Sequence, residues 1–324
     1  MNLNTLSKDD LIQLQYEKGE VNITIEKKGA NKALLKILNE VLAKKDIAIN
    51  LVIDNREHSD DENAKGLDIA AFLPNLKRLS MQAVLTVAIE SIEQLAIVEE
   101  ITQLKIYGFI KNGISLQSIE RFQNITTFEL ENGLNKKQQK IVDSYASLES
   151  LQVSELTLSS FTRKEKLTKL RIHKNLIDAD QLAEVMPGLK FLSLERCKKI
   201  SDFTFISSLK QVTELSIRHI KHISDLPDFN NPSIMKTVNF INSPNIKNID
   251  SIFACTGLTG FMATELSKLN TADFSRLSEL KNLKNVYITF KDKAENDRIQ
   301  EFVERNGWEY RQPGLASQSQ QSHK

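Results

Sequence analysis

Cysteine and glycine are scarce in this 324-residue sequence, and each scarcity excludes a class of protein. The two cysteines, Cys197 and Cys255, cannot build the disulfide framework of a small secreted domain. There are only 11 glycines, and neither a G-x-G-x-x-G nor a G-x-x-x-x-G-K-[ST] sequence is present. We therefore expect no disulfide scaffold, no phosphate-binding loop of the common kinds and no cofactor.

Charge of one sign and long apolar runs are missing as well. Lys and Arg number 43 and Asp and Glu 42, so the net charge is +1 and no one-signed field steers the chain toward nucleic acid or an anionic membrane. No stretch approaches the roughly 18 apolar residues that a membrane span needs. The N-terminal segment also lacks the basic-then-apolar layout of a secretory signal. These absences predict a cytoplasmic protein with neither a membrane nor a nucleic-acid partner.

What the chain does contain is an internal repeat. An apolar residue followed three and five positions later by two more recurs ten times, at intervals of 19 to 25 residues. The triplets are Leu76–Leu79–Met81, Ile101–Leu104–Ile106, Ile125–Phe128–Leu130, Leu148–Leu151–Val153, Leu167–Leu170–Ile172, Leu189–Leu192–Leu194, Val212–Leu215–Ile217, Met235–Val238–Phe240, Leu258–Phe261–Ala263 and Leu283–Val286–Ile288. Because side chains alternate faces along a strand, the second and third members point the same way. This spacing predicts parallel strands stacked as rungs.

Two of the units carry a longer motif. One runs Leu189-Lys-Phe-Leu192-Ser-Leu194-Glu-Arg-Cys197, and another ends on an asparagine, Leu167-Thr-Lys-Leu170-Arg-Ile172-His-Lys-Asn175. They resemble the leucine-rich repeat, L-x-x-L-x-L-x-x-N/C-x-L, and the first resembles its cysteine-containing form. The resemblance covers roughly residues 60–290 and is closest to an irregular, bacterial-type array. At the Asn/Cys position other units depart from the motif, with Gly133, Leu156 and Ser243.

This resemblance implies an α/β fold, a leucine-rich-repeat solenoid of about ten parallel strands with helical or turn returns, over residues 58–290. The long returns at 91–99 and 179–186 place apolar residues three or four apart, which is typical of a helix. At the start of the array, Ser59 and Glu62 have the spacing of a capping box and predict a helix there.

Residues 1–57 are predicted to form a small N-terminal α/β cap or a separate small module. Apolar residues alternate on both sides of Gly19, which predicts a β-hairpin over 12–25 with the glycine in its turn. A helix is predicted over 31–44 and a buried strand over 47–54.

A C-terminal cap is predicted over 291–312, because the last rung of an array would otherwise expose its core. Its amphipathic helix spans 294–306, and Gly307 stands where a left-handed residue ends a helix. Trp308 is expected to fold back onto that helix. Residues 313–324 are rich in Gln and Ser, have no apolar residues to bury and are predicted to be disordered.

No catalytic or metal site is predicted. His219 and His222 are three residues apart but fall at a strand exit and bend, without further ligands at suitable spacing. Cys197 occupies the inward position of its repeat and Cys255 precedes a strand, so both are expected to be buried structural thiols. We expect a protein that is not an enzyme and that holds no metal.

In the leucine-rich-repeat family the concave face of the sheet is the usual protein-binding surface, and the resemblance implies the same here. Residues between the apolar positions of each strand would line it. Candidate contacts with a partner protein are Lys105, Tyr107, Glu129, Glu131, Lys169, Arg171, His173, Glu195, Arg218, Met262 and Tyr287. Among these we expect an acidic site of two glutamates and a basic site on a later strand, which suit a partner of complementary charge. Met262 and Tyr287, with Ile241, either contact the partner or pack beneath the C-terminal helix.

The leading hypothesis is a monomeric, non-enzymatic cytoplasmic module that binds another protein through the concave face. Two sharper alternatives remain open: an immunity protein or antitoxin that blocks a cognate bacterial toxin, and a secreted effector whose leucine-rich repeats target it. RNA binding through residues 163–174 is disfavoured, because the net charge is near zero and few aromatic residues are available for base stacking. The sequence does not identify the partner.

Overall fold

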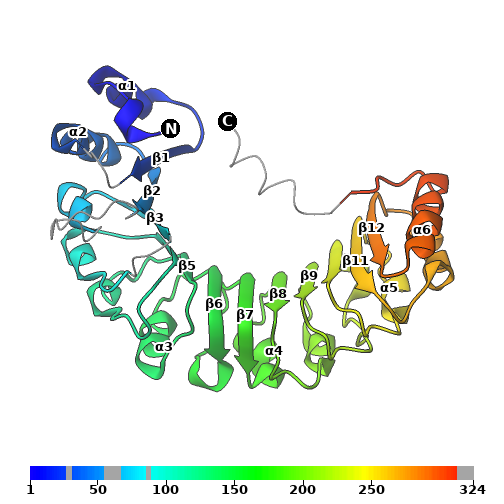
Figure 1. The fold of residues 1–324 in the computed structure, drawn as a ribbon. Helices are drawn as coiled ribbons and strands as arrows, with labels where there is room; N and C mark the ends of the chain where they lie inside the picture. The colour runs from blue at the N-terminus through cyan, green and yellow to red at the C-terminus, as the bar shows by residue number, and fades with distance from the viewer. Residues whose placement is uncertain (27–30, 55–66, 85–88, 312–324) are drawn as a thin grey trace. The chain divides into compact units, whose positions relative to one another are not determined.

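The structure, a computed structural model, describes residues 1–26, 31–54, 67–84 and 89–311. The predicted capping box at 59–62 and the predicted tail at 313–324 lie outside these residues. Strands follow one another in the sheet in chain order (Figure 1). Their bounds are Val21–Glu26 (β1), Ile47–Asp54 (β2), Arg78–Val84 (β3), Gln103–Gly108 (β4), Thr127–Leu130 (β5), Ser150–Thr157 (β6), Lys169–Ile177 (β7), Phe191–Glu195 (β8), Glu214–Arg218 (β9), Thr237–Ile241 (β10), Gly260–Leu266 (β11) and Asn285–Phe290 (β12).

The chain divides into two compact units, an N-terminal unit over residues 1–154 and a C-terminal unit over 155–324, with the boundary inside β6. Strand pairing within each unit is parallel. The α-helices are Lys8–Gln13 (α1), Lys32–Leu42 (α2), Lys136–Asp143 (α3), Leu182–Val185 (α4), Asp250–Phe253 (α5) and Lys293–Arg305 (α6). In the described part of the chain, no helix has the length and apolar content to cross a membrane.

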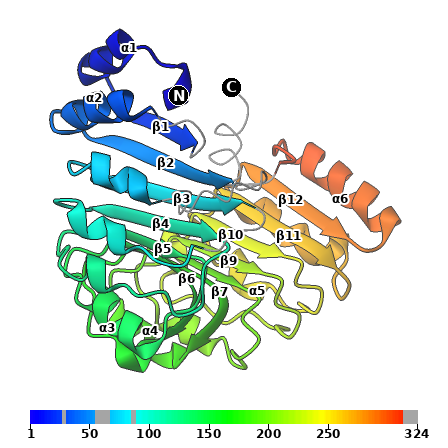
Figure 2. The same cartoon turned by 60° about the vertical axis from the view of Figure 1, so that its left-hand side comes forward.

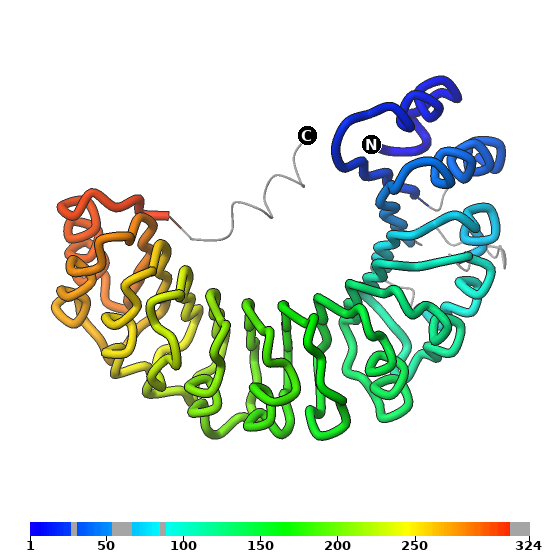
Figure 3. The backbone as a smooth tube through the Cα atoms, turned by 180° about the vertical axis from the view of Figure 1, so that it is seen from behind, coloured from blue at the N-terminus to red at the C-terminus, as the bar shows by residue number. Residues whose placement is uncertain are grey.

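The predicted triplets are the rungs of the sheet. All ten coincide with strands β3 to β12, and none of their thirty side chains is more than 5% exposed. The middle residues stand in register, as Leu170 with Leu192 and Leu192 with Leu215. Each turn of the backbone comprises one strand and one return segment, as the tube shows for the C-terminal unit (Figure 3). Burial of the triplets is therefore the main force that holds neighbouring rungs together.

The described residues hold twelve strands, two more than the triplets predict. The additional strands are β1 and β2, which pair in parallel with each other, and β2 continues in register onto β3. The chain up to Asp54 therefore extends the repeat sheet. The strand predicted over 47–54 and the helix predicted over 31–44 are confirmed as β2 and α2.

The hairpin predicted over 12–25 is wrong. Residues from Lys8 form helix α1, and only Val21–Glu26 is a strand. Ser7 begins the helix with a capping box, in which its hydroxyl accepts from the Asp10 amide and the Asp10 carboxylate accepts from the Ser7 amide. Leu11 and Leu14, three apart, are buried, whereas Tyr16 is 72% exposed. The helical spacing of the two leucines and the cap outweigh the short alternation.

Most return segments are tighter than the predicted helices. The return predicted to be helical at 91–99 is a 3₁₀ turn at Glu93–Ile97, and the one at 179–186 combines a 3₁₀ turn with the short helix α4. A return has to close within a single repeat, and the 3₁₀ helix covers the distance with fewer residues. Amphipathic spacing alone does not separate the two helix types.

The C-terminal cap has the predicted form. Helix α6 ends at Arg305, and Gly307 follows with a φ of 70°. Trp308 packs edge-on against Phe302, with ring centroids 5.6 Å apart. Beyond it, Glu309 forms a single parallel bridge with Asn285 on β12.

A column of inward side chains in the C-terminal unit contains one polar residue whose hydroxyl is buried without a hydrogen-bond partner in the described chain. Cys197, Ile220 and Ser243 occupy the same position of successive repeats, and each is at most 1% exposed. The Ser243 hydroxyl has no hydrogen-bond partner among the described residues. A buried hydroxyl without a partner costs about 1–3 kcal/mol.

Replacement of Ser243 by cysteine, the residue that Cys197 places in the same column, is therefore expected to raise the free energy of unfolding by about 1 kcal/mol. Urea denaturation followed by circular dichroism measures the change, and Ser160→Cys at an exposed position of the same unit serves as the control. An unchanged or lower midpoint for Ser243→Cys would mean that the hydroxyl is bound, for example by a buried water molecule.

Candidate protein-binding surface

Each unit has one sheet face that carries the return segments and one that does not, which we call the open face (Figure 2). Side chains that alternate with the buried triplets point to the open face, and parallel register aligns them in rows. One row of the N-terminal unit is Asn50, Ser80, Lys105, Glu129 and Gln152. The corresponding row of the C-terminal unit is Arg171, Ser193, Ser216, Asn239, Met262 and Tyr287.

In the N-terminal unit, the predicted contact residues bond to one another. Glu129 is only 4% exposed, and the prediction that it is accessible is wrong. Its Oε1 lies 3.0 Å from Lys105 Nζ, and its Oε2 accepts a hydrogen bond from the Tyr107 hydroxyl. Both partners come from the neighbouring strand β4 and cover the carboxylate. The glutamate charge is therefore neutralised within the fold.

Glu131 is exposed, as predicted, but it also has a structural contact. Its carboxylate accepts a hydrogen bond from the Gly108 amide at the end of β4, and its backbone oxygen accepts one from the Ser154 hydroxyl. These bonds tie three successive strand ends together. Of the predicted acidic pair, the Glu129 carboxylate is buried and the Glu131 carboxylate already accepts a hydrogen bond from the fold.

In the C-terminal unit, Glu195 is the corresponding acceptor. Its Oε1 lies 2.6 Å from Arg196 Nη1, and its Oε2 lies 3.4 Å from His173 Nδ1. The glutamate side chain is 15% exposed, whereas Arg196 is 60% exposed. His173 and Glu195, both predicted contact residues, are thus brought together by the fold.

Arg171 has an aromatic neighbour and no acidic one. Its guanidinium lies 4.7 Å from the centroid of the half-buried Phe191 ring on β8, which gives a cation–π contact. Lys169, on the same strand, is exposed. Throughout the described residues, no carboxylate lies within salt-bridge distance of Arg171. Contact with the Phe191 ring restricts the arginine without removing its charge.

Arg218 stands opposite Glu195 in the register of β8 and β9, yet the two do not form a salt bridge. The arginine is half-buried, and its Nε is screened from solvent without a hydrogen-bond partner in the described part of the chain. On the next strand, Asn239 Oδ1 is likewise screened from solvent without a hydrogen-bond partner among the described residues. Because Glu195 is already engaged by His173 and Arg196, the Arg218 charge has no counter-ion among the residues that the structure describes.

Met262 and Tyr287 differ from the predicted exposed positions. Met262 is 2% exposed, so the prediction that it offers contact area is wrong. It stands in register between Asn239 and Tyr287, which are half-buried on the flanking strands. Tyr287 stacks on Tyr310 with centroids 5.1 Å apart. Tyr287 therefore packs against the C-terminal cap, and Met262 is buried within the sheet beside it.

The strand exits of the C-terminal unit share a rare backbone conformation. Positive φ values of 52° to 61° recur once in each of four successive repeats, at Arg196, His219, Asn242 and Glu265. The amides of the first two donate to the strand-end carbonyls of Arg218 and Ile241. Those of the second two donate to the hydroxyls of Thr264 and Thr289. A left-handed residue turns the chain out of the sheet at each rung while keeping its amide bonded.

The histidine pair lies at this bend, as the repeat register predicts. His219 Nδ1 lies 3.0 Å from the Asn242 side-chain nitrogen, and His222 Nε2 lies 2.5 Å from the Ile200 carbonyl oxygen. Both rings thus contact groups of neighbouring rungs. Within the residues that the structure describes, no group of three His, Cys, Asp or Glu side chains is arranged to hold a metal ion.

Both thiols are in the core, as predicted. Cys197 and Cys255 are 0% exposed, and burial raises the pKa of each thiol to about 12. The Cys197 sulfur also lies 3.5 Å from the Glu195 carbonyl oxygen. A thiol with such a pKa stays protonated at neutral pH and is a poor nucleophile.

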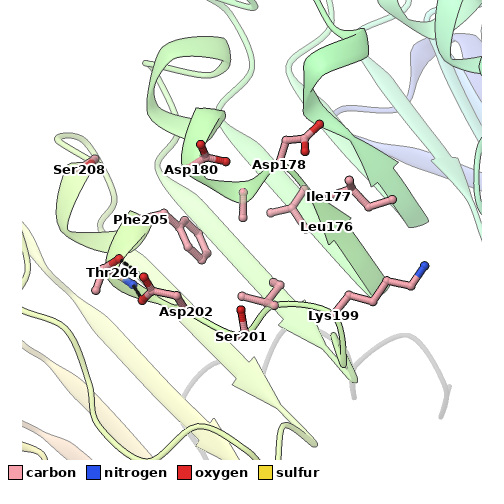
Figure 4. Close-up of a pocket in the computed structure, with 12 residues that line it drawn as sticks. Leu176, Ile177, Asp178, Asp180, Lys199, Ser201, Asp202, Thr204, Phe205 and Ser208 are labelled. Carbon is pink, nitrogen blue, oxygen red and sulfur yellow. Dashed lines mark hydrogen bonds between the residues drawn. The ribbon is translucent and has the colours of Figure 1, made fainter.

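A shallow pocket of about 660 Å³ lies beside the strand exits of β7 and β8, and no pattern in the sequence pointed to it (Figure 4). Leu176, Ile177 and Phe205 contribute apolar surface, and three carboxylates lie on its rim. The Asp202 carboxylate accepts from the amide and hydroxyl of Thr204, and the backbone bond is the main reason that its pKa is lowered. Lys199 extends away from Asp202 (Figure 4). Neither a histidine nor a cysteine is among the described residues that line this pocket.

The repeat geometry decides the fold. Ten buried triplets stand on successive parallel strands, with one return segment between each pair and an inward column that begins with Cys197. The chain has the leucine-rich-repeat fold. In the repeat whose motif ends on an asparagine, the Asn175 side chain donates a hydrogen bond to the Glu155 side chain and not to the backbone of the bend.

Comparison with known proteins finds similar solved structures only at low sequence identity among those reported below. No family model matches the chain, and no curated protein matches it. A crystal structure of a TLR13–ssRNA13 complex shares 16% identity at a TM-score of 0.42, covering 83% of this chain and 39% of that chain. An internalin from Listeria monocytogenes shares 12% identity at a TM-score of 0.39, covering 86% of this chain and 92% of that chain. A leucine-rich-repeat protein from Leptospira interrogans shares 14% identity at a TM-score of 0.35, covering 95% of this chain and 93% of that chain.

Two residues of the leucine-rich-repeat open face escaped the sequence reasoning. Phe191 precedes the apolar pair of its strand and was not counted as outward-facing, although an aromatic residue at an open-face position is a signal of contact. Arg196 lies one residue beyond the strand, and nothing in its sequence context indicates that it bonds to Glu195. Their roles follow from strand register and from the left-handed bend.

Proposed function

We propose that this leucine-rich-repeat chain is a protein-interaction module that binds its partner through the open face of the sheet. The observation that supports it most is the state of the arginines on β7 and β9. Arg171 and Arg218 are held by Phe191 and by partial burial, and the described chain supplies no counter-ion to either. Arginine and aromatic side chains in this setting are typical of interface hot spots.

Non-enzymatic binding accounts for the remaining groups with the fewest assumptions. The two thiols are buried and protonated at neutral pH, and neither a histidine nor a cysteine is among the described residues that line the acidic pocket. An immunity protein that occludes a toxin and a secreted effector that captures a target would both use such a surface. The proposed surface therefore fits both alternatives raised by the sequence, and the leading form of the proposal is a monomer in the cytoplasm.

A protein partner fits the charge distribution better than a nucleic acid does. The net charge is +1, and on the open face of β8 and β9 the carboxylates of Glu195 and Glu214 lie among the arginines. A phosphate backbone carries a charge at every nucleotide and would meet these carboxylates, whereas a protein partner can place acidic groups at the arginines alone and neutral or basic groups beside the glutamates.

A steric block at the open face tests this function. Ser80→Trp on β3 and Ser193→Trp on β8 place a bulky ring on the open face of the N-terminal and the C-terminal unit, where serine leaves space. Capture from an extract of the source organism, quantified by mass spectrometry, is expected to show a bound protein whose yield falls about tenfold or more with one of these variants.

The matched controls place tryptophan on exposed return segments, at Lys210 and Gln123. They are expected to retain the wild-type yield, and circular dichroism confirms that all four variants fold. Capture that is indifferent to both serine variants, or that is lost equally with the controls, would contradict binding at the open face.

A further inference from the structure

We propose that the open face of β7 to β9 binds an acidic segment of the partner, with Arg171 and Arg218 each engaging one carboxylate. This assignment rests on the proposed function and names the chemistry of the ligand. Asp and Glu carboxylates match the guanidinium group because its planar N–H donors pair with two oxygens at once.

The two arginines are partly buried open-face cations with no counter-ion among the described residues, whereas Lys169, which also has no salt bridge there, is exposed. Lys105 is paired with Glu129, and Arg78 at the base of β3 is paired with Glu20 and Asp46. In the same part of the chain, Arg171 has a cation–π contact with the Phe191 ring and no hydrogen bond or salt bridge, and Arg218 has no polar partner at its buried Nε. The fold holds both cations in place without neutralising them.

The arrangement around Arg218 explains why its charge is left over. Glu195, its register neighbour, accepts from Arg196 at 2.6 Å and faces His173 at 3.4 Å. The left-handed backbone at Arg196 brings that arginine back beside Glu195. A half-buried guanidinium without a counter-ion is costly, and a ligand carboxylate would relieve that cost.

Strand geometry sets the spacing of the two carboxylates. Arg171 and Arg218 lie two strands apart and are offset by two residues along the strands, since Arg171 is in register with Ser193 and Arg218 with Glu195. With about 4.8 Å between strands and about 3.3 Å per residue, they are about 12 Å apart. On the line between them, the small side chains of Ser193 and Ser216 leave room for a main chain to lie on the surface, and Glu195, already engaged by Arg196 and His173, flanks this path on the side of Arg218. At about 3.3 Å per residue, an extended segment bridges this distance with acidic residues three or four positions apart.

Random peptides displayed on phage supply the probe. A dodecapeptide library is selected against the immobilised full chain, the Arg171→Gln/Arg218→Gln variant and the Lys210→Gln/Lys281→Gln variant, which removes the same charge from exposed return positions. Wild type and the return-segment variant are expected to enrich peptides with two acidic residues three or four apart. The double arginine variant is expected to lose this enrichment.

Fluorescence polarisation then measures the most enriched peptide against wild type. Replacing its two acidic residues by glutamine or asparagine is expected to weaken binding about tenfold or more. Arg171→Lys/Arg218→Lys is expected to restore part of the affinity, since lysine keeps the charge and loses the paired geometry.

Three results would overturn the inference. The first is a selection that enriches no peptides, or that enriches peptides without pairs of acidic residues. If the enriched peptides without acidic pairs no longer bind the Ser193→Trp variant, the open face still binds proteins and only the acidic ligand is wrong. The second is an equal loss with the return-segment variant, which would reduce the effect to net charge. In the third, a single-stranded RNA oligonucleotide binds more tightly than the best peptide and depends on both arginines, which would assign the surface to RNA.

Discussion

Replacing Gly108 with alanine is expected to lower the free energy of unfolding by about 2–5 kcal/mol, the sum of backbone strain and overpacking. Gly108 ends strand β4 with a φ of 86°. A Cβ atom there would overlap the Ala83 carbonyl oxygen and lie 3.0 Å from its carbon. Because the obstacle is backbone of the neighbouring strand, no side-chain movement relieves it.

Gly19→Ala separates the two causes. Gly19 has a φ of 92°, and nothing lies within 4 Å of its added Cβ, so this variant reports the backbone strain alone. A loss of about 1–2 kcal/mol is expected for it. Urea denaturation monitored by circular dichroism compares the two proteins. Equal losses would show that β3 yields to the new methyl group and that close strand approach is unimportant at this rung.

Truncation of Phe274 to alanine is expected to cost about 3–5 kcal/mol, as for other large core aromatics. Phe274 is 0% exposed and lies in the return turn Thr271–Glu279. Its ring centroid is 6.1 Å from that of Phe261 and 5.9 Å from that of Phe290. It therefore joins the last two strands to their return segment, and its loss leaves a cavity that the rigid rungs cannot close.

Phe274→Leu keeps most of the volume and is expected to cost less than half as much as the alanine variant. Phe109→Ala, at a ring that is 60% exposed, is expected to change stability by no more than about 0.5 kcal/mol. The same denaturation measurement ranks the three. If Phe274→Ala were as mild as Phe109→Ala, the aromatic contacts of the return segment would not contribute to holding the last rungs.

Features that depend on local period were predictable. The triplet spacing placed strands β3 to β12, because alternation along a strand and the length of one repeat fix which side chains face inward. The same reasoning placed Cys197 in the core and His219 at a bend. It failed for α1, where a capping box and two leucines three apart compete with a short alternating pattern over the same residues.

Exposure of individual open-face residues was less predictable. Glu129 and Met262 occupy the outward positions that the period assigns, and yet both are buried. Glu129 is covered because Lys105 and Tyr107, on the preceding strand, bond to it. Met262 is buried between the half-buried Asn239 and Tyr287 of the flanking strands. Period gives the direction of a side chain, and its neighbours decide how much of it meets solvent.

For this protein the sequence alone determined the repeat, its register and the residues of its core, since these follow from apolar spacing within one strand. Which charges the fold neutralises was decided only by tertiary structure. Glu195 bonds to Arg196 and faces His173, while Arg218, its neighbour in the register, has no counter-ion among the described residues. Such choices depend on side chains from successive repeats meeting across neighbouring strands and on the left-handed bend that directs Arg196. No local sequence pattern shows which charges will pair, because the distances between side chains of different repeats and the direction of the backbone at each bend are set only when the rungs are stacked.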